Sequence, residues 1–139
     1  MSDPEGLLDT SAVLALRRLR DPSLLPDVAL ISAITLAELS VGPLVASDDA
    51  ERARRLAHVQ QAEADFDPIP FDAPAARAYA RVAAACRQSG RKPTARSFDA
   101  MIAATAIANG LPLYTANPAD FAGIDQLVVR AVPAPGREG

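Results

Sequence analysis

The chain has 139 residues, 50% of them hydrophobic, and a formal net charge of −3, which suits one domain with a single sizeable core. The acidic balance argues against a protein that coats nucleic acid through charge alone, because such domains are usually basic, but it does not exclude a nuclease. The apolar stretches are too short to span a membrane and the acidic N-terminus is unlike a signal peptide, so we expect a cytoplasmic protein.

Short apolar runs alternate with longer helical stretches along the chain, a pattern typical of a parallel sheet covered by helices. The expected strands are Gly6–Leu8, Val28–Ser32, Pro68–Phe71, Leu111–Tyr114 and Leu127–Val132. The expected helices are Ser11–Arg20, Thr35–Val45, Asp49–Asp65, Pro74–Ser89, Phe98–Asn109 and a short one from Pro118. We therefore predict an α/β fold in one domain over residues 1–132, followed by a disordered tail over residues 133–139.

Four carboxylates lie where a strand gives way to a helix, or within a helix that can face the same place: Asp9, Glu38, Asp99 and Asp120. Like charges at close range raise one another's pKa, so converging acids usually have a divalent cation to neutralise them. Oxygen ligands favour a hard ion such as Mg²⁺ or Mn²⁺. Together the four acids predict a metal site.

Taken one at a time, most of these acids also have a structural explanation. Asp9 can cap the first helix, and Asp99 lies where a negative charge stabilises a helix start. Asn117 followed by Pro118 predicts a capped helix start, which would put Asp120 in its first turn. Glu38 is less ordinary, because apolar residues surround it and no basic residue stands three or four positions away. It needs a partner unless it occupies the outer surface of its helix.

Basic residues are grouped just before the third acid. Arg87, Arg91, Lys92 and Arg96 run up to Asp99. This run can be a solvated helix end and loop, or it can hold the phosphates of a nucleic acid. Both interpretations stay open. The lone histidine, His58, lies on what the sequence indicates is a solvated helix, with no neighbouring histidine or cysteine to share a zinc ion.

Four motifs in order resemble the PIN-domain ribonucleases, and most closely the VapC-type toxins of bacterial toxin–antitoxin pairs. They are Asp-Thr-Ser-Ala from Asp9, Leu-Ala-Glu-Leu around Glu38, Phe-Asp-Ala-Met-Ile-Ala-Ala-Thr-Ala around Asp99 and Leu-Tyr-Thr-Ala-Asn-Pro-Ala-Asp-Phe, which ends at Phe121. The resemblance extends from Leu7 to about Val132. Any single motif is weak, whereas four acidic motifs in the family's order and spacing are specific.

The resemblance implies a three-layer α/β/α fold with a central parallel sheet, and a metal-dependent hydrolysis of RNA phosphodiester bonds. It implies that Asp9, Glu38 and Asp99 bind Mg²⁺, or Mn²⁺ in its place. Some relatives carry a fourth acid where this chain has Asn117 and others where it has Asp120. We place the fourth acid at Asp120, because Asn117 is expected to cap the helix that Pro118 begins. The residues implied to support the acids or bind substrate are Thr10, Ser11, Thr115, Asn117, Arg87, Arg91, Lys92 and Arg96.

The resemblance also implies two protein partners besides the RNA substrate: a second copy of the chain, and a cognate antitoxin that inhibits the enzyme. Leucines of the early helices are candidate apolar anchors for the antitoxin, namely Leu14, Leu24, Leu25 and Leu44.

Two other functions fit parts of the pattern. An acid-pocket phosphatase would also gather acids at strand ends, but Asp9 is not followed by a second aspartate two positions on, and no lysine follows a late strand. A non-catalytic PIN-like binding or regulatory protein is disfavoured because Asp9, Glu38 and Asp99 are all retained.

Overall fold

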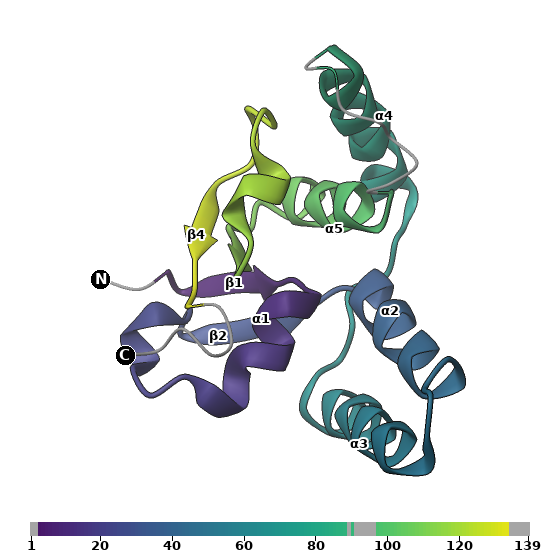
Figure 1. Cartoon of the computed structure of the whole chain (residues 1–139). Helices are drawn as coiled ribbons and strands as arrows, with labels where there is room; N and C mark the ends of the chain where they lie inside the picture. Colours follow the sequence, from purple (N-terminus) through teal and green to yellow (C-terminus); the bar gives the residue numbers. More distant parts are fainter. Residues whose placement is uncertain (1–2, 89, 91–96, 134–139) are drawn as a thin grey trace.

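A computed structural model describes residues 3–88, 90 and 97–133 of the chain (Figure 1). In chain order the elements are β1 (Glu5–Leu8), α1 (Thr10–Ala15), the 3₁₀ turns η1 (Leu16–Arg18) and η2 (Pro22–Leu24), β2 (Val28–Ile31), α2 (Ala33–Leu44), α3 (Asp49–Asp65), α4 (Ala73–Gln88), α5 (Ser97–Ala108), β3 (Leu113–Thr115), the 3₁₀ turn η4 (Pro118–Phe121) and β4 (Val129–Ala131). The predicted tail lies outside these residues apart from Pro133.

The four strands form one parallel sheet in the order β2-β1-β3-β4. Leu7 of β1 pairs with Leu30 on one side and with Leu113 on the other, so β1 is central. The chain leaves β1 toward β2 and later returns to the other side of β1 as β3. The strand order therefore reverses between β1 and β3, and open α/β sheets bind ligands outside the carboxyl ends of their strands at such a point.

Alternate side chains of the sheet build two separate cores, one on each face. Leu7 and Leu113 point to the face covered by α4 and α5, while Leu8 and Tyr114 point to the face covered by α1, α2 and α3. Figure 1 shows α4 and α5 on one side of the strands and α1, α2 and α3 on the other. The three-layer α/β/α prediction is confirmed.

Small side chains let α5 lie close against α4. The buried residues of this helix are mostly alanines, including Ala100, Ala103, Ala104 and Ala106, and the helix is apolar on nearly every side. Such a helix must be covered on both flanks, and it packs between the sheet and α4. Gly110 follows it with a φ of 64°, a left-handed conformation that ends the helix.

Three predicted elements differ from the structure. The strand expected at Pro68–Phe71 is wrong: Ile69 forms only an isolated bridge with Ser32, because Pro68 and Pro70 on either side lack the N–H groups that a ladder needs. The first helix ends at Ala15 and continues only as a 3₁₀ turn. The segment from Pro118 is also a 3₁₀ turn rather than an α-helix. Among the described residues, no helix is long and apolar enough to cross a membrane.

Gly6 gives a direct test of the sheet packing. A Cβ at Gly6 would lie 2.5 Å from Cε1 of Tyr114, and the Tyr114 ring is anchored because its hydroxyl donates to Oδ2 of Asp3 at 2.6 Å. We expect Gly6→Ala to lower the free energy of unfolding by about 1–3 kcal/mol through overpacking, measured by urea denaturation. At Gly42 the added Cβ would meet only flexible Arg55 atoms, at 3.3 Å or more, so Gly42→Ala is the control and should cost less. A Gly6→Ala protein as stable as the wild type would contradict this packing.

Candidate active site

The carboxyl ends of β1 and β3 carry the central residues of the candidate site. Asp9 follows β1 directly, and its backbone N–H donates to the Tyr114 carbonyl of β3 at 3.0 Å. Thr115, the last residue of β3, is fully buried beside it. These two residues therefore lie at the point where the strand order reverses, as a ligand site of this fold class requires.

Asp9 is a carboxylate buried to an unusual degree, with only 5% of its surface exposed. Its Oδ1 accepts hydrogen bonds from the backbone N–H of Ala12 at 2.9 Å and from the Ser11 hydroxyl at 2.6 Å. The first bond makes Asp9 the N-cap of α1, so the capping interpretation and the strand-end interpretation are both correct. Burial raises the pKa of Asp9 above its ordinary value, and the charge of Asp120 adds to the rise, against the opposing hydrogen bonds from Ser11, Thr115 and Ala12.

Glu38 approaches the same place from α2. The Thr10 hydroxyl, at the start of α1, donates to Oε1 of Glu38 at 2.6 Å. The glutamate is half-buried, which excludes a position on the outer surface of its helix. Its pKa is raised, first by burial and further by the charge of Asp9, while the bond from Thr10 lowers it. Asp9 and Glu38 are thus two acids within range of each other's charge.

The other two acids lie on the segments that flank β3. Asp120 lies in the first turn of η4, half-buried, and is close enough for its charge to raise the pKa of Asp9. Asp99 lies in the first turn of α5 and is also half-buried. Because α5 leads into β3 through a short turn, the two run in opposite directions, and the first turn of α5 lies toward the carboxyl edge of the sheet.

Asn117 does not have the role that its place before Pro118 predicted. Its side chain makes no capping hydrogen bond, and its φ of −127° and ψ of 67° differ from the extended backbone of a normal N-cap. Its backbone N–H instead donates to the hydroxyl of Thr115 at 3.0 Å, and the residue is exposed. The capping prediction for Asn117 is therefore wrong.

The predicted basic surface is described only in part. Arg87 is exposed in the last turn of α4. Arg91, Lys92 and Arg96 lie outside the residues that the structure describes. The role of this run in holding phosphates stays a prediction.

The donor chemistry at this edge suits a hard divalent cation. Asp9 and Glu38 offer oxygen ligands, burial and mutual repulsion disfavour their charged forms, and within residues 3–88, 90 and 97–133 neither forms an ion pair with a basic side chain. In those same residues, however, no three His, Cys, Asp or Glu side chains stand close enough together to hold one ion. The fit to a metal therefore rests on Asp9 and Glu38, with the other acids nearby.

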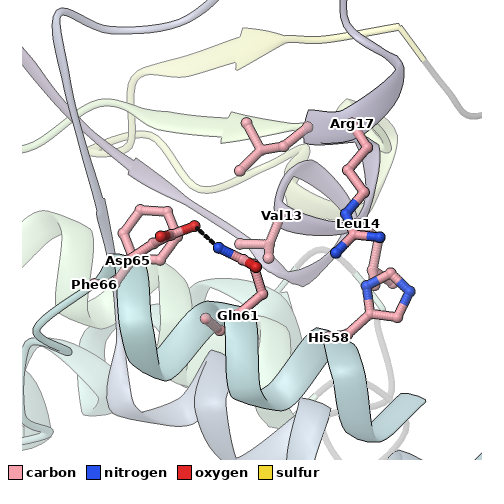
Figure 2. A pocket seen from close by; sticks show the side chains of 9 residues that line it. Val13, Leu14, Arg17, His58, Gln61, Asp65 and Phe66 are labelled. Atoms are coloured by element: carbon pink, nitrogen blue, oxygen red, sulfur yellow. Dashed lines mark hydrogen bonds between the residues drawn. The ribbon is translucent and has the colours of Figure 1, made fainter. Parts of the chain in front are cut away.

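A groove between α1 and α3 was not anticipated from the sequence (Figure 2). It encloses about 200 Å³ and is lined by Val13, Leu14, Leu16, Arg17, His58, Gln61, Ala62, Asp65 and Phe66. Figure 2 shows Arg17 beside His58 at one end and the 2.8 Å bond from Gln61 to Asp65 at the other. His58 is half-buried against this groove rather than fully solvated. Its helix carries polar residues at these positions, so no apolar periodicity pointed to the groove.

Comparison with known proteins gives a consistent result. The chain matches the PIN domain family over residues 7–127. It is 41% identical over 122 residues to Ribonuclease VapC5 of Mycobacterium tuberculosis, covering 86% of this chain and 87% of that protein. The structure resembles that of a VapBC-5 toxin-antitoxin system from the same organism, with a TM-score of 0.79 and 36% identity over 93% of this chain and 99% of that one. It also resembles FitAcB from Neisseria gonorrhoeae, with a TM-score of 0.68 and 27% identity over 88% and 94% of the two chains.

The raised pKa of Asp9 predicts how stability depends on pH. The folded chain holds the Asp9 proton more tightly than the unfolded chain does, so the contribution of Asp9 to stability is full below the unfolded pKa and is lost as pH rises through the folded pKa. Asp9→Asn keeps a good N-cap and removes the buried charge. We expect it to raise the melting temperature at pH 7 in EDTA, with a gain that shrinks as the pH falls through the raised folded pKa and is gone below about 4, near the ordinary aspartate pKa.

The control for this measurement is Asp21→Asn. Asp21 also caps a short helical turn, but it is exposed and its pKa is lowered by hydrogen bonds from Ser23. This change should not stabilise the protein at pH 7. If Asp9→Asn lowered the melting temperature at pH 7 as much as the control does, burial of the Asp9 charge would not destabilise the protein.

Proposed function

Because the chain belongs to the PIN-domain family, we propose that it is a metal-dependent endoribonuclease toxin that a cognate antitoxin protein holds inactive. Its relatives of known name are ribonucleases, and a resembling solved structure is a toxin-antitoxin system. These names describe those proteins, and the same activity is our proposal for this one. We place it in the cytoplasm, where its RNA substrate and its antitoxin are made.

One observation carries the proposal: two carboxylates that repel each other, the buried Asp9 and the half-buried Glu38, lie at the carboxyl edge of the sheet with no basic partner among the described residues. Burial of like charges lowers the stability of the fold, and this cost brings no benefit to a domain that binds nothing there. A divalent cation would relieve the repulsion of Asp9 and Glu38 and lower the pKa of both groups.

The ion expected here is Mg²⁺, with Mn²⁺ as its substitute, and when bound it would polarise the phosphodiester and lower the pKa of an attacking water. Asp9 and Glu38 would hold it, with Asp99 supplying a further carboxylate from the start of α5. Thr10 fixes the rotamer of Glu38 through its 2.6 Å hydrogen bond. Asp120 would orient the water or bind the ion through a water. No nucleophile from a side chain is needed.

Single-stranded or looped RNA is the substrate that suits this edge best. Loops expose phosphates and base edges that a shallow site can reach, whereas paired RNA hides them. Aromatic residues are only 4% of the chain and tryptophan is absent, so base stacking would contribute little. We propose that Arg87 and the neighbouring basic residues Arg91, Lys92 and Arg96 hold the RNA backbone.

We further propose that the antitoxin lays an amphipathic helix along the groove between α1 and α3. The groove has an apolar floor that includes Val13 and Phe66, with a basic end at Arg17 and an acidic one at Asp65. Of the four predicted leucine anchors, Leu14 lines this groove, and Leu24 and Leu44 are exposed elsewhere. Leu25 is less suitable because it packs against the core beneath α1, α2 and α3. The expected homodimer stays a prediction.

The activity is tested with purified protein and RNA. We expect cleavage with Mg²⁺ or Mn²⁺ and none in EDTA. Asp9→Asn and Asp99→Asn should each lower the cleavage rate by roughly 100-fold or more, as loss of one charge-stabilising group from an active site commonly does. Asp125→Asn is the control, because this exposed aspartate makes the same change in charge away from the carboxyl edge. Full activity in EDTA, or equal losses in all three variants, would end the proposal.

The antitoxin groove is tested by binding. The partner is the product of the reading frame beside the gene, co-expressed and purified. Leu14 is 40% exposed in the groove, and Leu14→Glu should weaken binding at least about tenfold, equivalent to 1.4 kcal/mol. Val128→Glu is the control, because Val128 is 50% exposed beside Arg130 and Gln126, away from the groove. Equal affinity of the Leu14→Glu protein and the wild type would place the antitoxin elsewhere, and a toxin that no neighbouring product inhibits would refute the partner itself.

A further inference from the structure

Two hydroxyl groups, from Ser11 of α1 and Thr115 of β3, join segments that are far apart in the sequence. Their oxygens lie 3.3 Å from each other. Ser11 Oγ accepts the backbone N–H of Ala116 at 2.9 Å, and Thr115 Oγ1 accepts the backbone N–H of Asn117 at 3.0 Å. We call these two side chains the hydroxyl clasp.

The direction of each hydrogen bond in the clasp follows from the donors around it. A hydroxyl has one proton to donate and two lone pairs that accept, whereas a backbone N–H can only donate. The Ser11 proton is directed at Oδ1 of Asp9, which is 2.6 Å away. Thr115 also has a single proton, and it serves either Ser11 Oγ at 3.3 Å or the Asp9 carboxylate. Both hydroxyls therefore accept from the chain that follows β3, and Ser11 donates to the buried acid.

The chain that the clasp holds is the one that carries Asp120. Ala116 and Asn117 give their N–H groups to the clasp, and the backbone of Asp120 is bonded in turn to the Asn117 carbonyl at 3.0 Å. These three hydrogen bonds, together with the 2.6 Å bond from Ser11 to Asp9, connect the segment that carries Asp120 to Asp9. Thr115 is also fully buried, so its hydroxyl cannot reach a substrate.

We propose that Ser11 and Thr115 are positioning residues, which fix residues 116–120 against Asp9 and so set the separation of the Asp9 and Asp120 carboxylates. They act on the reaction through these two acids and do not bind RNA. The effect on metal binding rests on the proposed function, whereas the hydrogen bonds of the clasp do not depend on it.

Hydrogen exchange of single amides tests the clasp without any activity. Thr115→Val keeps the shape of the side chain and removes the hydroxyl, while Thr115→Ser keeps the hydroxyl. We expect the amide of Asn117 to exchange at least about tenfold faster in Thr115→Val than in the wild type, with most of the protection kept in Thr115→Ser. Ser11→Ala should do the same to the amide of Ala116, and it provides the second variant if Thr115→Val fails to fold.

Thr105→Val is the matched control. Thr105 is a fully buried threonine whose hydroxyl bonds to the Met101 carbonyl of its own helix at 2.9 Å, so the substitution is identical in kind and separate from the clasp. The amides of Ala116 and Asn117 should exchange at the wild-type rate in this variant. Fast exchange of both amides in the wild type, or equal acceleration by Thr105→Val, would overturn the clasp.

Mn²⁺ titration of the melting temperature tests the positioning role. The Mn²⁺ concentration that gives half of the maximal rise should increase at least about tenfold in Thr115→Val and stay near the wild-type value in Thr105→Val. Asp120→Asn added to Thr115→Val should then have a smaller effect than Asp120→Asn alone, because the clasp acts through Asp120. Additive effects would overturn the positioning role. If Mn²⁺ leaves the wild-type melting temperature unchanged, the proposed metal site fails, and hydrogen exchange alone decides on the clasp.

Discussion

The burial of the Asp9 carboxylate is the constraint on which the rest of the site depends. A charged group away from water is costly unless hydrogen bonds replace its hydration. Here the replacement comes from the N–H of Ala12 and the hydroxyls of Ser11 and Thr115. These donors belong to α1 and β3, so the requirement to satisfy one carboxylate joins the central strand, its helix and the neighbouring strand at the edge where the strand order reverses.

These hydrogen bonds do not fully offset the burial of the Asp9 charge, and the remaining cost links stability to function. The pKa of Asp9 stays raised despite its three donors, and Glu38 and Asp120 place further negative charge within range. A chain selected for stability alone would replace one of these acids with a neutral residue. Carboxylate oxygens that the fold already holds close together suit a cation-binding site, because the ion removes their repulsion and binds to a geometry that already exists. The groove between α1 and α3 is lined by none of these acids.

The parallel sheet covered by helices and the strand-end position of Asp9 followed from short apolar runs between helical stretches, because buried parallel strands and their covering helices have distinct periods. The three-layer arrangement was implied by the family resemblance. The failures have local causes. Pro68 and Pro70 read as part of an apolar run, but their missing N–H groups reduce it to a single bridge at Ile69. Asn117 precedes a proline as a cap should, yet its backbone N–H donates to Thr115 and its backbone does not have the dihedral angles of an N-cap. The groove forms between helices that are distant in the sequence, and no local pattern encodes such a contact.

A divalent cation bound by the buried Asp9 and the half-buried Glu38 would complete the site. The most direct measurement is a crystal structure grown with Mn²⁺ and examined by anomalous scattering at the manganese edge. Our account predicts a peak at the carboxyl ends of β1 and β3, within about 2.0–2.6 Å of carboxylate oxygens that include one from Asp9. Saturating Mn²⁺ with no anomalous peak at Asp9, or a peak only at another part of the surface, would contradict it.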